Sequence, residues 1–280
     1  MNNITLGADQ TWKAAAGPLV FGGTTSDGGF TLTIDGSRNV TFIAGSGLTG
    51  SGGLTKSGTN TLTINAPLTF TGAITLNNGK IETSLNNVLS SGQNITFNGG
   101  TLSGLSKSQT LGALTLAASS RINLQPGNGV GVLTFSSASV SGGTLTIAGW
   151  TGTAGQPASD DKIVINAAPN AAFLSAVQFL GAGFGPGAVY LAATHEIVPA
   201  QPLSPPTPTT LSSPMRLSDT EFQFIVSDAV AGRSYTFQRS TNLTNWIPLA
   251  PPYTATTNQF IFQDPYATNS LGFYRLLSNP

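Results

Sequence analysis

The stretch SGGLTKSGTNTLTINAPLTFTGAITLNNGKIETS, residues 51–84, repeats a short phrase in which a threonine lies between two apolar residues. Glycine and asparagine separate the phrases, and only Lys56, Lys80 and Glu82 carry a charge. Alternation with period two is typical of a strand with one buried face. Glycine and asparagine supply the positive φ angles that tight corners need. The stretch therefore predicts short β-strands joined by tight corners.

The phrase recurs through the first half of the chain at a nearly constant interval. One apolar series, with spacings of 22, 20, 21, 19 and 19 residues, is Leu32, Leu54, Ile74, Ile95, Leu114 and Leu133. A second series follows it by seven or eight residues: Val20, Val40, Leu62, Ile81, Leu102, Ile122 and Val140. A third, looser series is Leu48, Leu68 and Val88. Three short strands in every ~20 residues predict a parallel β-solenoid, or β-helix. A β-sandwich, the alternative, does not require a fixed register.

The composition divides this all-β chain into four parts. We expect a solenoid over residues 1–150, its C-terminal cap over 151–200, a linker over 201–214 and a small β-sandwich-like domain over 215–280. The linker is predicted from five prolines in fourteen residues. In the last part, EFQFIVSD, SYTFQRST, NWIPLA, QFIFQDP and GFYRLL predict five strands.

The ends of a solenoid expose unpaired backbone groups. We expect residues 4–12 to cover the N-terminal end. Ile4, Leu6 and Trp12 mark this segment as a candidate assembly strand, able to pair with a neighbouring copy.

Two parts of the chain resemble known families. GSGGLTKSGTNTLTI followed by FTGAITLNNGKIE is similar to the autotransporter-associated β-strand repeat of bacterial surface and secreted proteins, a likeness that extends over about residues 1–200. It implies export and a solenoid, but no activity. The segment from Gly232 to Trp246, closing with FYRLL, resembles small immunoglobulin-like or fibronectin-type-III-like modules at the C-termini of secreted bacterial proteins.

Charge and composition exclude several classes of function. Charged residues make up 8% of the chain, eleven basic against eleven acidic. Such a chain has no field to attract nucleic acid or an anionic membrane. It has no cysteine, and no apolar run reaches the ~18 residues of a membrane span. Residues 1–10 lack the signal-peptide pattern, so an exported chain is expected to be a trimmed form.

Candidate catalytic groups are sparse. Glu82 is the only acidic residue between Gly36 and Ser159, whereas glycoside hydrolysis needs paired carboxylates. Asp160 and Asp161 are expected to solvate a turn or to cap a strand, and His195 to form a surface hydrogen bond. We therefore predict no catalytic residues, no metal site and no cofactor.

Two sets of side chains are candidates for binding instead. The outward threonines predicted to form one file are Thr33, Thr55, Thr75, Thr96, Thr115 and Thr134. A flat threonine array can bind ice, but the neighbouring column is mixed, and threonine is a favoured strand residue. The C-terminal aromatics could form a carbohydrate platform, although in so small a domain we expect them in the core: Tyr235, Phe237, Trp246, Phe260, Phe262, Phe273 and Tyr274.

The expected function is structural. The sequence favours an exported bacterial protein, extracellular or on the cell surface, that forms a surface spacer or assembles head to tail into a filament. The alternatives are an adhesin that binds glycans or a host surface, an ice-binding protein and, least favoured, a polysaccharide-active enzyme.

Overall fold

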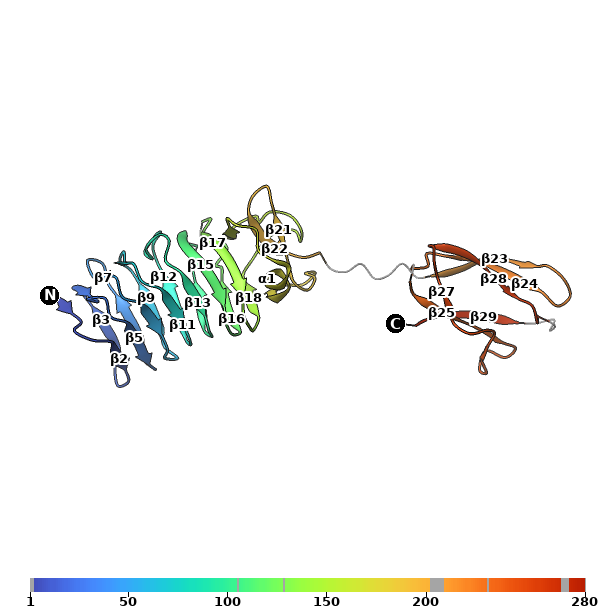
Figure 1. The fold of residues 1–280 in the computed structure, drawn as a ribbon, viewed down its shortest axis with the longest axis horizontal. Helices are drawn as coiled ribbons and strands as arrows, with labels where there is room; N and C mark the ends of the chain where they lie inside the picture. Colours follow the sequence, from blue (N-terminus) through green and yellow to red (C-terminus); the bar gives the residue numbers. More distant parts are fainter. Residues whose placement is uncertain are drawn as a thin grey trace. The chain divides into compact units, whose positions relative to one another are not determined.

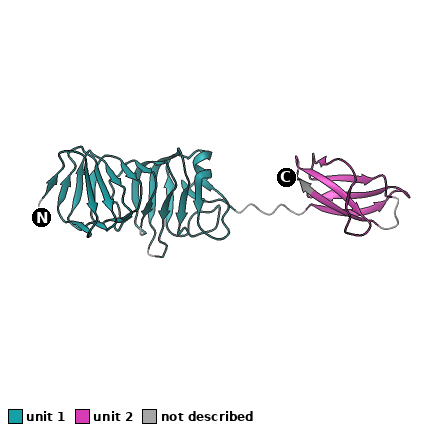
Figure 2. Ribbon diagram, turned by 90° about the horizontal axis from the view of Figure 1, so that it is seen from below, with its two compact units in different colours: residues 1–202 teal, residues 203–280 magenta. Residues whose placement is uncertain are grey.

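The computed structural model describes residues 3–104, 106–127, 129–201, 209–230, 232–267 and 272–279. The chain divides into two compact units, residues 1–202 and 203–280 (Figures 1 and 2). Nearly all regular structure is β, which confirms the predicted fold class. The one helix of the described residues is α1 (Ala171–Ala176).

The first unit is a parallel β-solenoid with turns of about 22 residues (Figure 1). Sheet A has the order β1 (Ile4–Thr5), β4 (Thr24–Ser26), β7 (Gly47–Gly50) and β10 (Thr69–Phe70). Sheet B has the order β2 (Gln10–Ala14), β5 (Leu32–Gly36), β8 (Leu54–Lys56), β11 (Ile74–Leu76), β13 (Ile95–Phe97), β15 (Gln109–Leu116), β17 (Val132–Val140), β19 (Lys162–Ile165), β22 (Glu196–Pro199) and β21 (Ala188–Leu191). Sheet C has the order β20 (Val177–Phe179), β18 (Leu145–Ala148), β16 (Ser120–Asn123), β14 (Thr101–Ser103), β12 (Lys80–Thr83), β9 (Thr61–Ile64), β6 (Val40–Phe42) and β3 (Leu19–Phe21).

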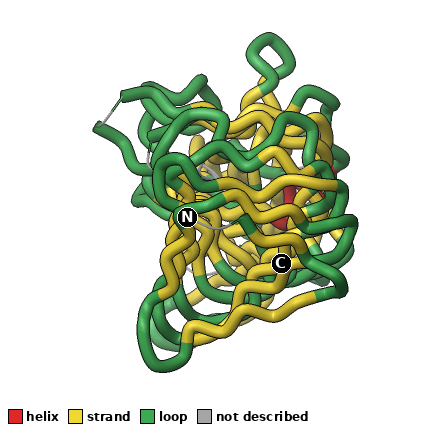
Figure 3. The backbone as a smooth tube through the Cα atoms, turned by 90° about the vertical axis from the view of Figure 1, so that its left-hand side faces the viewer, coloured by secondary structure: helices red, strands yellow, loops and turns green. Residues whose placement is uncertain are grey.

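The apolar series meet in one continuous core. Leu54 pairs with both Leu32 and Ile74, and Ile81 pairs with both Leu62 and Leu102. These side chains are fully buried and belong to a single hydrophobic cluster. The series Leu48, Leu68 and Val88 joins the same cluster. The end-on view in Figure 3 shows strands of successive coils lying one behind another.

Glycine supplies the left-handed corners, as the sequence predicts. Gly79 has φ 68° and Gly100 has φ 71°. A Cβ on Gly79 would lie 2.2 Å from the carbonyl oxygen of Gly58, so the adjacent coil also approaches too closely for a side chain. The asparagines beside these glycines instead form a ladder in which Asn98 Nδ2 donates to Asn77 Oδ1 at 3.0 Å.

The predicted register is wrong at both extremes of the repeat. Leu19, not Val20, pairs with Val40, and Val20 is 61% exposed. At the other extreme, Ile122 pairs with Ile147 instead of Val140. The coil from Ile122 to Ile147 has 25 residues, whereas the coil from Leu102 to Ile122 has 20, and most of the added length lies between β16 and β17. A constant period therefore misplaces every residue after Ile122.

The second unit consists of two antiparallel sheets. One has the order β23 (Thr210–Arg216), β24 (Phe222–Ser227) and β28 (Gln259–Asp264). In the other, β25 (Ser234–Ser240) pairs with β26 (Ile247–Pro248), β27 (Tyr253–Thr254) and β29 (Phe273–Asn279). The rings of Phe237 and Phe262 stack 3.6 Å apart and join the two sheets. All five predicted strands are present, with β23 and β27 in addition.

The predicted linker is partly a strand. Residues 202–208 lie outside the described residues, but residues 210–214 belong to β23. The pairing of β23 with β24 shifts register between Ser212 and Met215, and Pro214 lies within that irregularity. Proline is tolerated on an edge strand at a bulge, because no ladder hydrogen bond needs its missing N–H. Counting prolines alone therefore placed the domain boundary too far along the chain.

Candidate functional surfaces

The N-terminal end of the solenoid presents free strand edges. Residues 4–12 do not form a separate cap: they belong to the first coil, in which β1 pairs with β4 and β2 pairs with β5. Among the described residues, β1, β2 and β3 are each the last strand at one end of their sheet. One edge of each strand therefore has no partner strand in the part of the chain that the structure describes.

The direction of the free backbone groups on β2 follows from its pairing. The Gln10 amide donates to Thr31 O at 3.0 Å, and Ala14 O accepts from the Ser37 amide at 3.0 Å. Successive residues of a strand direct their backbone groups to opposite edges. The N–H and C=O groups of Thr11 and Lys13 are therefore directed to the free edge.

The candidate assembly residues differ in exposure. Ile4 is 42% exposed, whereas Leu6 is 4% exposed and belongs to the core. Trp12 is half-buried and stacks on Phe21 at 4.8 Å, and Phe21 stacks on Phe42 at the same distance. Trp12 thus closes an aromatic stack along the solenoid, and the surface left for a partner is mainly backbone edge.

The C-terminal end of the solenoid is built differently. The parallel coils continue past the predicted boundary at residue 150, because β19 pairs parallel with β17, and β20 with β18. After them, β22 pairs antiparallel with β19, and β21 antiparallel with β22. Two reversals restore the direction, so β21 runs parallel to the strands of the coils and ends sheet B.

Aromatic side chains close the core at this end. Trp150 makes edge contacts with Phe179 at 5.7 Å and with Phe184 at 5.4 Å. Phe173 of α1 is fully buried in the same cluster. The apolar core therefore ends beneath α1 and the residues around Phe184.

The threonine file is present with six members, as predicted, but it lies one strand closer to the N-terminal end than predicted. Threonines occupy equivalent positions in six consecutive strands of sheet B: Thr11, Thr33, Thr55, Thr75, Thr96 and Thr115. Thr134 does not continue the file, since it pairs with Thr110, while Thr115 pairs with Ser139. The longer coil before β17 causes this shift. Thr11, which was not predicted from the sequence, extends the file to the free edge.

The acidic residues and the histidine are engaged in local contacts. Glu82 forms an ion pair with Lys80. Asp161 is buried, and its carboxylate accepts from the amides of Gly131 at 2.6 Å and Gln125 at 2.9 Å. Asp160 accepts from the Gly127 amide at 2.7 Å. Asp160 and Asp161, which precede β19, therefore fasten their loop to the backbone between β16 and β17, whereas the ion pair of Glu82 lies within one strand.

His195 lies in the turn between β21 and β22, with φ 58°. Its Nδ1 lies 2.8 Å from the Tyr190 hydroxyl and 2.9 Å from Asn166 O. The neighbouring Glu196 is 2% exposed, accepts from the Ala158 amide at 2.9 Å and lies 3.5 Å from Lys162 Nζ. His195 and Glu196 therefore hold the terminal hairpin against the last coil.

Lys56 has a structural role that the sequence pattern did not predict. Its side chain is fully buried at the end of β8, where Nζ donates to Gly58 O and to Asn78 O. Burial lowers the pKa of Lys56 from 10.5 to about 8, although the nearby Asp35 carboxylate opposes the shift. The lysine thus donates to carbonyl groups of two successive corners. Because its pKa is lowered, burial of its charge destabilises the folded state.

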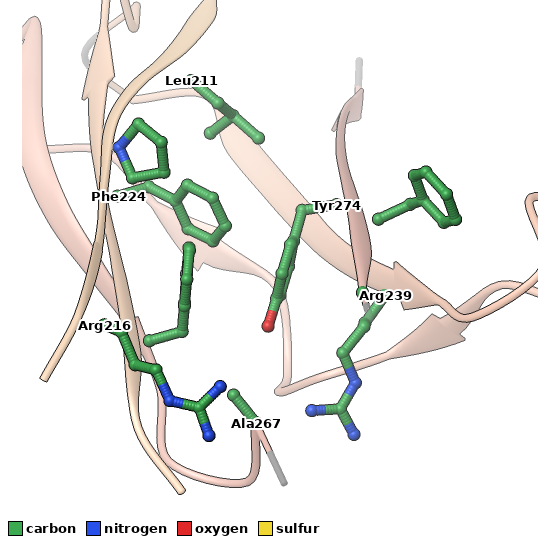
Figure 4. Close-up of a pocket in the computed structure, with 10 residues that line it drawn as sticks. Leu211, Arg216, Phe224, Arg239, Ala267 and Tyr274 are labelled. Atoms are coloured by element: carbon green, nitrogen blue, oxygen red, sulfur yellow. The ribbon is translucent and has the colours of Figure 1, made fainter. Parts of the chain in front are cut away.

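A pocket of about 490 Å³ lies in the C-terminal unit (Figure 4). The aromatic residues of this unit form two groups, one in the hydrophobic core and one along the pocket. Tyr235 and Phe237 are buried in the core, and Phe260 and Phe262 pack against them, as expected. Phe273 and Tyr274, which were also expected in the core, instead line the pocket.

Trp246 lies apart from both groups. The guanidinium of Arg275 is 4.2 Å from the centre of its ring, and its indole nitrogen donates to Leu243 O at 3.0 Å. Trp246 is half-buried, so it covers the surface of the unit and is not part of the core.

Comparisons with known proteins add no relative: no family model, no curated protein and no solved structure matches this chain. Among the described residues, no helix is long and apolar enough to cross a membrane. Within the same residues, no three His, Cys, Asp or Glu side chains gather where they could hold a metal ion.

Proposed function

We propose that this chain is a structural building block of a bacterial cell surface or extracellular appendage, and that its solenoid assembles head to tail. The observation that carries the proposal is the free edge of β2 at the N-terminal end of sheet B. An exposed strand edge is a template for pairing with another chain.

The strand at the other end of sheet B fits this edge. Because β21 runs in the same direction as β2, β21 of one copy can pair with β2 of the next in the parallel manner that joins the coils themselves. β21 has four residues and β2 has five, so their lengths differ by one residue. A joint of this type does not close on itself and builds a filament.

Sheets B and C end at different positions along the solenoid axis. This difference indicates which strands can pair between two copies. β22 and β21 extend sheet B two strands beyond the level of β19, whereas sheet C ends with β20. The joint therefore uses β2 and β21 and leaves β20 and β3 unpaired with each other. The low charge of the chain, 8%, leaves little repulsion between copies.

The resemblance of residues 51–84 to the autotransporter-associated repeat supports an exported, extracellular location. It also supports a role as a spacer, not as an enzyme. The local contacts of the acidic residues support the same role. In this proposal Glu82→Ala, Asp160→Ala and His195→Ala each leave unchanged any activity measured on a polysaccharide. Loss of turnover in one of them would identify an enzyme.

A single substitution at the free edge tests the assembly. Proline at Thr11 removes an outward N–H and places its ring at the edge, and edge strands accept proline on their unpaired side. Valine at the same position keeps the N–H and the β-branched shape. We expect fibres in electron micrographs of the parent and Thr11→Val proteins, and monomers for Thr11→Pro. A parent protein that stays monomeric at high concentration, or fibres in all three, would refute the joint.

A further inference from the structure

The pocket in the C-terminal unit has the size and composition of a ligand site. Its volume of about 490 Å³ lies within the range of roughly 300–1,000 Å³ that is typical of small-molecule sites. It opens between the two sheets, with residues from β23 and β24 on one side and from β25 and β29 on the other. The hydrophobic cluster around Tyr235 and Phe237 includes only Leu211 among these residues, although Phe224 and Ala267 are themselves buried.

One wall of the pocket is aromatic. The rings of Phe222 and Tyr274 stack 5.5 Å apart with an interplanar angle of 11°, and Phe224 meets Tyr274 at 4.5 Å. Phe224 is buried, whereas Phe222 and Tyr274 are partly exposed. This wall offers flat apolar surface to a ligand in the pocket.

The other end of the pocket carries hydrogen-bond donors. Figure 4 shows the guanidinium groups of Arg216 and Arg239 extending toward the hydroxyl of Tyr274, with Ala267 between them. They come from separate sheets, Arg216 from β23 and Arg239 from β25. Both guanidinium groups and the hydroxyl therefore lie at the same end of the pocket.

Asp264 holds two of these groups in place. Its fully buried Oδ2 accepts from Arg239 Nη1 at 2.8 Å and from the Tyr274 hydroxyl at 3.1 Å. Its Oδ1 accepts from the Tyr266 amide at 3.0 Å. Burial and the adjacent Asp264 charge raise the pKa of Tyr274, so the phenol remains a donor. The carboxylate is thus satisfied by groups of the protein, and Arg239 is fixed before any ligand arrives.

Both arginines keep donors for a ligand. Arg239 uses Nη1 for Asp264 and Tyr266 O, and Arg216 uses Nε and Nη2 for Ser218 O and Asp219 O. Among the described residues, Arg239 Nε and Nη2 and Arg216 Nη1 have no partner. The Asp219 carboxylate lies 4.0 Å from Arg216 but is fully exposed, where solvent screens the pair. An entering anion therefore meets two guanidinium groups and no unsatisfied buried carboxylate.

We propose that this pocket binds an acidic saccharide, with the carboxylate of a uronic acid residue on Arg216 and Arg239. A pyranose ring has an apolar C–H face that suits the aromatic wall. Its carboxylate is planar, and guanidinium groups bind planar carboxylates with charge-assisted hydrogen bonds. The lone pairs of the Tyr274 hydroxyl accept from a sugar hydroxyl. This activity is independent of the assembly proposed for the solenoid.

The test is an NMR titration of the full chain with trigalacturonate, with its methyl ester and galactotriose as uncharged counterparts. We expect trigalacturonate to bind at least tenfold more tightly than either, more weakly as salt is added, and to shift the amide signals of Phe222, Gly272 and Tyr274. Equal binding of the ester would assign the site to neutral sugars and overturn the proposal. The absence of binding up to roughly 10 mM, the upper end of weak recognition, would also overturn it.

Arginine variants make the test specific to the pocket. The Arg216 side chain is 47% exposed, so Arg216→Gln should leave the fold intact, and we expect it to weaken trigalacturonate binding at least tenfold. Arg275→Gln is the matched control, because Arg275 contacts Trp246 outside the pocket. Phe222→Ser should weaken the acid and its ester alike. Equal losses in Arg216→Gln and Arg275→Gln would show that general charge, and not this pocket, binds the saccharide.

Discussion

The buried Lys56 makes the stability of the solenoid depend on pH in an unusual direction. Its pKa falls from 10.5 to about 8 in the folded chain. A shift of this size corresponds to about 3 kcal/mol of destabilisation at neutral pH, since each pKa unit is worth ~1.4 kcal/mol. Below pH 8 both states carry the proton and the full cost is present. Between pH 8 and 10.5 the folded state loses its proton first, so the free energy of unfolding rises with pH.

Lys56→Met should abolish this rise. Methionine has a similar volume and no charge, and replacing a buried charge with an apolar side chain is often neutral or stabilising. Lys80→Met is the control, because Lys80 is a partly exposed lysine in the same repeat. We expect the parent and Lys80→Met proteins to gain about 3 kcal/mol relative to Lys56→Met between pH 7.5 and 10.5.

The assay is urea denaturation at a series of pH values, followed by tryptophan fluorescence. In a Trp246→Phe background, the remaining tryptophans are Trp12 and Trp150, which both lie in the solenoid. Their signal therefore reports the unfolding of the first unit alone. Parallel pH profiles for the parent and Lys56→Met proteins would refute the argument, as would a parent protein that loses stability as the pH rises from 8 to 10.

Three further substitutions test the construction of the solenoid, each by urea denaturation. Ile95→Asp places an unpaired charge in the core and should cost more than ~4 kcal/mol, whereas Thr96→Asp, on the outer face of the same strand, should be tolerated; equal effects would contradict the register. Gly79→Ala puts a Cβ 2.2 Å from a backbone oxygen of the adjacent coil at φ 68°, and we expect a loss of at least ~2 kcal/mol; an unchanged midpoint would refute the corner geometry. Asp161→Ala leaves two backbone amides without an acceptor and should cost ~3 kcal/mol, whereas Asp160→Ala should cost under ~1 kcal/mol; the reverse order would show that Asp161 does not fasten the corners.

The solenoid was predictable from sequence because each coil repeats the same physical problem. Leu54, Ile74 and Ile95 each fill the same position of the core, so the apolar period is visible without a structure. The prediction failed where the period continued by coincidence. Leu133 and Val140 fall at the expected interval, but the greater length between β16 and β17 moves the true partners of Leu114 and Ile122 to Ala138 and Ile147. When alternating apolar residues lie on both sides of an insertion, the spacing of apolar residues does not reveal the insertion.

The surfaces were harder to predict for a different reason. Arg216 and Arg239 belong to different strands and sheets, and only the packing of those sheets brings them to one pocket. An aromatic residue such as Tyr274 is expected in the core of a small domain. Its position beside Asp264 depends on which face of β29 packs against β28. The free edge of β2 was anticipated, because any open solenoid must end in one. Its pairing groups, at Thr11 and Lys13, required the observed hydrogen bonds.

Hydrogen exchange at the first coil tests the assembly most directly. Amides directed into sheet B, such as Gln10 and Trp12, should be protected at every protein concentration, because they are bonded within one copy. The amides of Thr11 and Lys13 should exchange rapidly in dilute protein and become protected as the concentration rises and β21 of another copy pairs with β2. If Thr11 and Lys13 stay unprotected at high concentration, or are already protected in dilute monomer, β2 is not the assembly edge.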